Sequence, residues 1–218
     1  MSRTTTKTLE ILPNSTILFQ GDSITDCERN YKCSDSLGQG YVMMISSWYS
    51  AKYPEKNVKF INRGRNGDRV SQLKSRWRKD CLELKPDIVS ILIGINDVLG
   101  KCIWNRPTSV ENFENDYRYL LDQVKDEIHA NLVIMQPFLL DVAERYGNMR
   151  KELIMQIKVI EELSKEFDAV FIPLDTIFHE VSMKRRSSFW TNDGVHPTLP
   201  GHALIAQSWL RTVVNDTP

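Results

Sequence analysis

The strongest constraint on the fold is an alternation of short apolar runs with longer amphipathic stretches. The run at residues 88–93 is rich in β-branched side chains and is apolar on both faces. Strands that read as continuous apolar runs are typical of parallel sheets, which are covered on both faces. We therefore predict five buried strands, at residues 16–20, 58–62, 88–93, 132–135 and 170–172.

Between these runs, apolar residues recur at spacings of three and four, the period of a helix with one buried face. Helices are predicted within residues 70–84, 110–128 and 149–167, with a closing helix at 199–214. Thr108 or Ser109 is a plausible N-cap of the second. Repeated strand–helix alternation predicts an α/β fold with a parallel sheet and right-handed crossovers.

Length and composition narrow the functional class. The 218 residues fit one domain, expected to span 1–218 with an N-terminal extension at 1–13. Lys+Arg and Asp+Glu both number 28, so the charge excess of a nucleic-acid binder is absent. No apolar stretch is long enough to span a bilayer, and the polar N-terminus lacks a signal-peptide pattern, so a cytoplasmic protein is expected. The four cysteines lack metal-ligand spacing and are expected to be free thiols.

Polar residues gather in four loops. Gly21-Asp22-Ser23 follows the first predicted strand, residues 62–67 follow the second, and residues 94–97 follow the third. Residues 193–197 precede the closing helix. Ligands of open parallel sheets bind outside the carboxyl ends of the strands. We therefore expect the four loops to meet at one crevice.

Together these loops supply the groups that acyl transfer requires. Ser23 is the candidate nucleophile and His196 the base that would take its proton. Asp193, three residues upstream, is the candidate carboxylate that orients the imidazole. The Ser23 N–H, the Gly67 N–H and the Asn96 amide are the candidate donors of an oxyanion hole. The other three histidines, His129, His179 and His202, are expected to be surface or structural residues.

In this order, the four loops resemble the motif blocks of the SGNH hydrolases, also called the GDSL esterase/lipase family. The four letters of the name fall on Ser23, Gly67, Asn96 and His196, and the Asp-x-x-His element begins at Asp193. The resemblance implies a three-layer α/β/α sandwich with a five-stranded parallel sheet in the flavodoxin-like order 2-1-3-4-5. It also implies a serine esterase with a catalytic triad and no cofactor or metal.

Two positions depart from the family blocks. Ile24 stands where the fourth letter of the first block is Leu, and Asn66 stands where Ser or Ala is common. Longer segments at residues 17–27, 85–98 and 193–202 look closest to cytosolic bacterial acetyl-xylan-oligosaccharide esterases. The resemblance therefore implies hydrolysis of short-chain esters and the deacetylation of a sugar or oligosaccharide.

Several alternatives remain open from sequence. A lysophospholipase or thioesterase-type acylhydrolase, or a catalytically silent carbohydrate-binding member, would share the same blocks. Asp22 and Trp104 are expected to contact substrate, and the 99–107 segment that carries Trp104 is either a pocket wall or an ordinary surface loop. The expected partner is a small-molecule ester, without nucleic acid or membrane. The oligomeric state, including a homo-oligomer, is left open.

Overall fold

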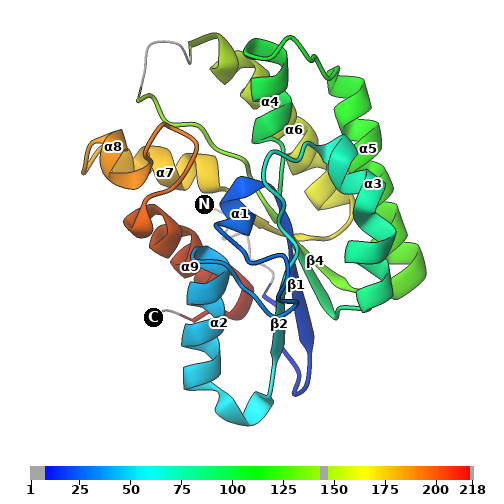
Figure 1. The fold of residues 1–218 in the computed structure, drawn as a ribbon. Helices are drawn as coiled ribbons and strands as arrows, with labels where there is room; N and C mark the ends of the chain where they lie inside the picture. Colours follow the sequence, from blue (N-terminus) through cyan, green and yellow to red (C-terminus); the bar gives the residue numbers. More distant parts are fainter. Residues whose placement is uncertain (1–7, 143–146, 217–218) are drawn as a thin grey trace, which may run out of the picture.

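Five parallel strands form one sheet at the centre of the protein, in the order β2-β1-β3-β4-β5 (Figure 1). The computed structural model describes residues 8–142 and 147–216. The predicted α/β class and the 2-1-3-4-5 order are both confirmed. The strands are β1 (Thr16–Gly21), β2 (Lys59–Asn62), β3 (Ile88–Leu92), β4 (Asn131–Met135) and β5 (Val170–Ile172).

Helices cover both faces of this sheet (Figure 1). They are α1 (Ser23–Asp26), α2 (Tyr41–Lys52), α3 (Val70–Asp80), α4 (Ile95–Cys102), α5 (Val110–Gln123), α6 (Gly147–Glu166), α7 (Leu174–Ser182), α8 (Ser187–Trp190) and α9 (Leu199–Val214). Helices α2, α7 and α9 pack on one face, and α3, α5 and the second half of α6 pack on the other.

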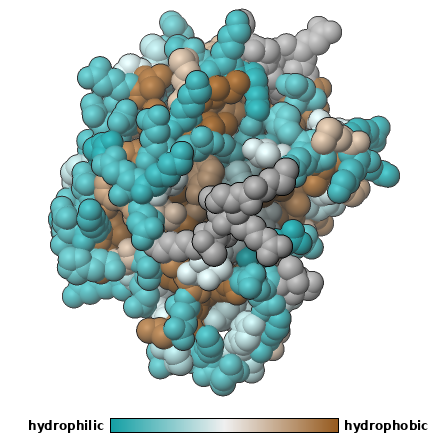
Figure 2. Space-filling view, turned by 180° about the vertical axis from the view of Figure 1, so that it is seen from behind, coloured by the Kyte–Doolittle hydropathy of each residue, from teal (hydrophilic) through white to brown (hydrophobic). Residues whose placement is uncertain are grey.

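The alternation of side chains along each strand divides the core into two clusters. In β1, Ile17 and Phe19 join the cluster under α2 and α9, while Leu18 joins the one under α3 and α5. Ser90 is the polar exception in the buried strand β3, and its hydroxyl accepts a hydrogen bond from Trp209 Nε1 at 3.0 Å. Hydrophilic residues cover most of the face of the molecule that lies behind the view of Figure 1 (Figure 2). Both faces of the sheet are therefore covered by packed side chains, and the sheet supports the loops at its edges.

Some elements differ from the sequence predictions. Helices α1, α2, α7 and α8 were not predicted, and residues 94–97, expected as a loop, include the first turn of α4. Asn and Asp favour turns because their side chains compete with the backbone for hydrogen bonds. Here burial overrides that preference, since Ile95, Val98 and Leu99 enter the core.

The predicted helix boundaries also change. The stretch at 70–84 divides into α3 and a 3-10 turn at Leu82–Leu84, and α5 passes into a π-helical turn at Val124–Ile128. Ser109, not Thr108, caps α5, because its side chain accepts the Asn112 N–H at 3.1 Å.

The described part of the N-terminal extension packs against the last helix. The Leu9 N–H donates to the Val213 carbonyl at 2.7 Å, and Ile11 is buried in the core. Residues 1–7 of the predicted extension lie outside the described residues. Across the described ranges, no helix combines the length and the apolar character needed to cross a membrane.

The strand ends that matter for function lie at one edge of the sheet. Because β1, β2 and β3 are parallel neighbours, the chain leaves all three at their common carboxyl edge. Register places Gly21 beside Leu92 and Phe19 beside Asn62, so the three following segments begin close together. These segments carry Ser23, Gly67 and Asn96.

Candidate active site

A chain of hydrogen bonds links Ser23, His196 and Asp193. Ser23 Oγ lies 3.0 Å from His196 Nε2, and His196 Nδ1 lies 2.8 Å from Asp193 Oδ2. The bond to Asp193 fixes the tautomer in which Nδ1 carries the proton, so Nε2 can accept from the serine hydroxyl. The arrangement can therefore take a proton from Ser23 while the carboxylate stabilises the resulting imidazolium.

The segment before α9 holds His196 in place through its own hydrogen bonds. Asp193 Oδ1 accepts the backbone N–H groups of Val195 at 2.9 Å and His196 at 2.8 Å. An isolated antiparallel bridge pairs Thr191 with Pro197, and the Leu140 N–H donates to the Gly194 carbonyl. The turn is thus anchored both internally and to the end of the sheet.

Ser23 is the first residue of α1, directly after β1. Asp22 caps this short helix, with Oδ1 accepting the Ile24 N–H at 3.0 Å. The side chain of Asp22 is 1% exposed, so it lies beneath the site and presents no surface to a substrate. Asp22 therefore supports the turn that carries Ser23, and its contact with substrate stays a prediction.

The two other candidate oxyanion donors lie on the neighbouring segments. Gly67 has φ of +80°, a left-handed conformation, and a Cβ added there would meet nothing within 4 Å. The glycine is therefore required by its backbone conformation rather than by crowding. Asn96 Nδ2 donates one hydrogen to the Asp68 carbonyl at 3.0 Å. An amide nitrogen carries two hydrogens, so the second can serve another acceptor.

Electrostatics favour a charged Asp193 beside a basic His196. Burial works to raise the pKa of Asp193, but hydrogen bonds from the His196 ring and two backbone N–H groups outweigh it and hold that pKa below its usual range. The hydrogen bond to Asp193 raises the pKa of His196 above its ordinary 6.5. Burial raises the pKa of Asp22 to about 7. Asp193 therefore stays charged, and His196 is a stronger base than an isolated histidine.

A cavity of about 570 Å³ opens beside Ser23 and His196. Most of its lining residues have polar side chains, and they come from α1, the segment between α1 and α2, the segment after β2, the segment before α9 and the start of α9. The lining residues are Ser23, Ile24, Asp26, Cys27, Glu28, Gln39, Asn66, Asn192, His196, Pro197, Thr198, Leu199 and His202. Trp104 is not among them. It lies beyond α4 and is 49% exposed, so the 103–107 stretch behaves as a surface segment among the described residues.

Sequence reasoning missed a second histidine in the cavity wall. His202 Nδ1 accepts the Tyr41 N–H at 3.2 Å, and its Nε2 lies 3.4 Å from Cys27 Sγ. Burial, together with the charge of His196, lowers the pKa of His202 to about 4. His202 was expected to be structural, which fits its satisfied ring. The sequence feature that could have indicated this position is that His202 lies on the buried face of the closing helix, six residues after His196.

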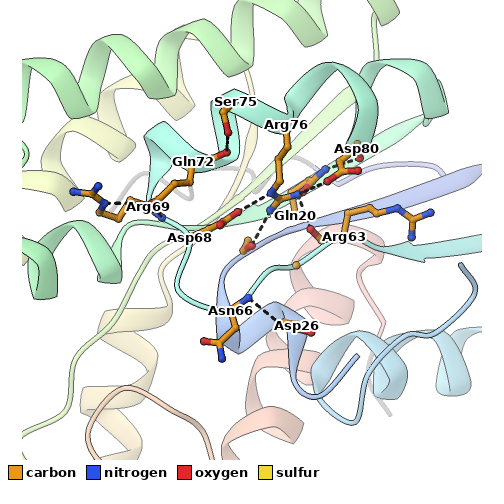
Figure 3. A network of polar contacts seen from close by, with 12 residues as sticks. Gln20, Asp26, Arg63, Asn66, Asp68, Arg69, Gln72, Ser75, Arg76 and Asp80 are labelled. Atoms are coloured by element: carbon orange, nitrogen blue, oxygen red, sulfur yellow. Dashed lines mark hydrogen bonds and ion pairs between the residues drawn. The ribbon is translucent and has the colours of Figure 1, made fainter. Parts of the chain in front are cut away.

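A buried arginine ties these segments together (Figure 3). Arg76 of α3 donates from Nε to Asp68 at 2.6 Å, and from Nη1 to the Arg63 carbonyl at 2.8 Å and Gln20 at 2.9 Å. Its Nη2 donates to the Gly21 carbonyl at 3.2 Å. One guanidinium therefore holds both the end of β1 and the loop that carries Gly67.

The described residues contain no group of three or more His, Cys, Asp or Glu side chains arranged to hold a metal ion.

Comparison with known proteins agrees with this geometry. The sequence model of the GDSL-like lipase/acylhydrolase family matches residues 19–204. An acetylxylan esterase of Geobacillus stearothermophilus is 32% identical over 205 residues, covering 90% of this chain and 93% of that protein.

Solved structures give the same result. A protein from Parabacteroides merdae assigned as a GDSL-like lipase superposes with a TM-score of 0.91 at 33% identity, covering 96% of this chain and all of the other. Axe2, an acetylxylan esterase from Geobacillus stearothermophilus, superposes with a TM-score of 0.86 at 31% identity, covering 94% and 96% of the two chains. The matched Axe2 structures include catalytic mutants in which a serine, an aspartate or a histidine is replaced by alanine. With a family match over most of its length, this chain belongs to the GDSL-like lipase/acylhydrolase family and is a carboxylic ester hydrolase.

Proposed function

We propose that this esterase removes acetyl groups from a sugar or oligosaccharide through an acyl-enzyme on Ser23. The observation that carries the proposal is the hydrogen-bonded series Ser23–His196–Asp193 at the wall of a cavity lined by both polar and apolar groups. In the first step His196 Nε2 takes the Ser23 proton while Oγ attacks the acetyl carbonyl carbon. The Ser23 and Gly67 N–H groups and the Asn96 amide receive the negative charge that develops on the carbonyl oxygen.

Collapse of the tetrahedral intermediate breaks the bond to the sugar oxygen, which leaves with the proton from His196. A water molecule then attacks the acetyl-Ser23 carbonyl, with His196 again taking the proton. Collapse of this second intermediate breaks the bond to Ser23 Oγ, which regains the proton from His196, and acetate is released. The charged Asp193 stabilises the imidazolium in both halves.

The cavity lining supports a short acyl group and a polar alcohol. Ile24, Pro197 and Leu199 are its aliphatic residues, whereas Asp26, Glu28, Gln39, Asn66, Asn192 and Thr198 can hydrogen-bond sugar hydroxyls. Each buried methylene of a long acyl chain would gain about 0.8 kcal/mol only if an apolar surface covered it. Similarity to acetylxylan esterase over most of both chains agrees with this assignment.

Acetate release tests the proposal. The purified protein is given acetylated xylo-oligosaccharides and p-nitrophenyl esters of two to ten carbons. Acetyl and propionyl esters are expected to react faster than octanoyl and decanoyl esters. Ser23→Ala should lose several orders of magnitude of activity. Ser71→Ala, at an exposed position of α3, is the matched control.

A fluorophosphonate probe should label the peptide that carries Ser23 in the wild type and in Ser71→Ala, but not in Ser23→Ala. Labelling of another serine would remove Ser23 from the mechanism. A preference for decanoyl esters or lysophospholipids would replace the sugar substrate with a lipid. Binding of xylo-oligosaccharide without hydrolysis of any ester would indicate a silent carbohydrate-binding protein.

A further inference from the structure

A second, strongly basic depression lies next to the active-site cavity. This groove of about 300 Å³ is lined by Arg29, Tyr31, Lys32, Ser34, Arg63, Arg65 and Asp80. We refer to these seven residues as the basic groove. They come from the segment between α1 and α2, the segment after β2 and the end of α3. None of them was singled out from sequence as a functional residue.

The basic groove and the active-site cavity share a wall. The Tyr31 hydroxyl, in the groove, donates to Asp26 Oδ2, and Asp26 lines the cavity. The Asn66 N–H donates to the same oxygen at 3.1 Å (Figure 3). Asn66 also lines the cavity, and its neighbour Arg65 lines the groove. A ligand with one group beside Ser23 can therefore extend over this wall into the groove.

The charge of the basic groove is unbalanced. It contains four cationic side chains and one carboxylate, Asp80, which already pairs with Arg76 at 3.2 Å. Burial and the nearby charge of Arg63 lower the pKa of the Arg29 guanidinium. Like charges held this close repel, and an anion placed between them would relieve the repulsion.

The guanidinium groups of Arg29 and Arg63 are held in place by hydrogen bonds to backbone carbonyls. Arg29 Nη2 donates to the Gly64 carbonyl at 3.1 Å, and its Cζ lies 4.6 Å from the centre of the Tyr31 ring. Arg63 Nη1 donates to the carbonyls of Ser34 at 3.1 Å and Asn62 at 2.9 Å. Each guanidinium has five N–H donors, so most remain available after these bonds. Within the described part of the chain, the buried Arg29 Nε has no hydrogen-bond partner.

The two remaining cations of the basic groove lie at its exposed side. Lys32 and Arg65 are exposed, and neither side chain forms an ion pair among the described residues. Two hydrogen-bonded guanidinium groups with two exposed cations form a site for an oxyanion, because Arg donors match the planar or tetrahedral oxygens of carboxylate and phosphate.

We propose that the basic groove binds a carboxylate or phosphate group carried by the acetylated sugar, so that the enzyme prefers anionic carbohydrate esters to neutral ones. This proposal rests on the sugar deacetylation proposed above. It adds a charge requirement to the substrate, and it locates that requirement outside the groups that perform the chemistry.

Kinetics on matched substrates tests the preference. Acetylated xylo-oligosaccharides with a uronic acid branch are compared with the same oligosaccharides without it, at low and high ionic strength. The wild type should favour the acidic substrate by about 10-fold in kcat/KM, the value of one hydrogen bond to a charged group. Salt should reduce this ratio, because exposed charges are screened.

The double variant Lys32→Gln/Arg65→Gln should bring the acidic-to-neutral ratio close to one. Lys158→Gln/Lys165→Gln is the matched control, since it removes the same charge from exposed positions of α6, which contributes nothing to the groove. This control should keep the wild-type ratio. Equal rates on acidic and neutral substrates in the wild type would overturn the charge preference while leaving the sugar deacetylation intact.

Direct titration separates the two anions and is independent of hydrolysis. Sodium glucuronate, glucose 6-phosphate and glucose are each added to the full-length protein, and backbone amide resonances are followed by NMR. Shifts of Tyr31 and Arg65 with glucuronate support a carboxylate, and shifts with glucose 6-phosphate support a phosphate. Shifts with glucose alone, or with none of the three, would overturn the anion site. If p-nitrophenyl acetate is cleaved but no acetylated sugar is, deacetylation fails, and this titration still decides whether the groove binds anions.

Discussion

Proton transfer from Ser23 and the hydrogen bond to Asp193 favour opposite protonation states of His196. To accept the Ser23 proton its Nε2 must be unprotonated, yet the Asp193 carboxylate 2.8 Å from Nδ1 favours the protonated ring. The Asp193 contact raises the pKa of His196 above 6.5, so a larger fraction of the enzyme is inactive at pH 6.5 than an isolated histidine would allow. Activity should therefore rise with pH along an acid limb that lies above pH 6.5.

Replacing Asp193 with Asn keeps the side-chain shape and removes its charge. Without the carboxylate the imidazolium is less stable, so the acid limb of kcat/KM should move to lower pH, while kcat falls by several orders of magnitude because the tautomer is no longer held. Asp126→Asn, at an exposed position before β4, is the control and should change neither. Near-wild-type turnover with an unmoved limb would remove Asp193 from the mechanism.

Asn96 differs from the other proposed oxyanion donors because it donates through a side chain. Asn96→Ala should lower kcat by roughly 100- to 1,000-fold, the usual cost of one such donor, with a much smaller change in KM. Asn115→Ala, on the exposed side of α5, should leave both unchanged. If KM rises strongly while kcat is kept, Asn96 binds substrate in the ground state instead.

The site residues were predictable from sequence because their chemistry requires specific side chains after specific strands. Ser23, His196 and Asp193 are brought together as expected, at 3.0 Å and 2.8 Å. Asp22 and Trp104 were harder to place, because burial and side-chain direction decide whether a polar or aromatic residue reaches a cavity. Sequence spacing does not contain that information for a four-residue helix such as α1 or for a surface segment.

At the scale of elements, α3 acts on the site through Arg76. Its donors reach Asp68, Arg63 and Gly21, so it sets the distance between the end of β1 and the loop that carries Gly67. Arg76→Lys keeps the charge but lacks the planar fork that meets these acceptors. We expect kcat to fall about 10- to 100-fold with KM little changed, because a shift of about 1 Å in a catalytic group costs that much.

Arg78→Lys is the matched control on the same helix, since Arg78 is 64% exposed and pairs with Glu127. Both variants are assayed well below their melting temperatures, so that a loss of stability alone does not lower the rate. If Arg76→Lys lowers the melting temperature but keeps the wild-type kcat, Arg76 stabilises the fold and does not position the catalytic groups.

The strands and the long helices were predicted well because their hydrophobic periodicity is strong. The five runs predicted from sequence correspond to β1–β5, with no boundary shifted by more than one residue. Helix α4 was missed because Asn96 and Asp97 read as turn residues, although Asp97 Oδ2 in fact accepts the Val70 N–H at 3.1 Å. Whether a short helix forms depends on hydrogen bonds of this kind to residues far away in the sequence, and a local sequence pattern does not show them.

For the whole molecule, His202 makes stability sensitive to acid. Its pKa is lowered to about 4 in the folded state, against an ordinary value of 6.5 when unfolded. Between these values the unfolded chain binds a proton that the folded protein does not, so stability decreases as pH falls from 6.5 towards 4. The loss is at most about 3 kcal/mol.

His202→Asn keeps an acceptor for the Tyr41 N–H and removes the titrating ring. Its free energy of unfolding, measured by urea denaturation, should fall less steeply between pH 6.5 and 4 than that of the wild type. His129→Asn is the control, because His129 is exposed and has a positive φ that Asn tolerates. An unchanged slope in His202→Asn would assign the acid sensitivity to other groups.

The order of the chain also sets when the enzyme becomes active. Ser23 and His196 are 173 positions apart, and α9 follows His196 directly. At about 5 to 20 residues per second on the ribosome, roughly 9 to 35 s separate the synthesis of the proposed nucleophile from that of its proposed base. A chain synthesised only as far as α8 therefore carries the proposed nucleophile without its proposed base, and it cannot yet perform the proposed hydrolysis.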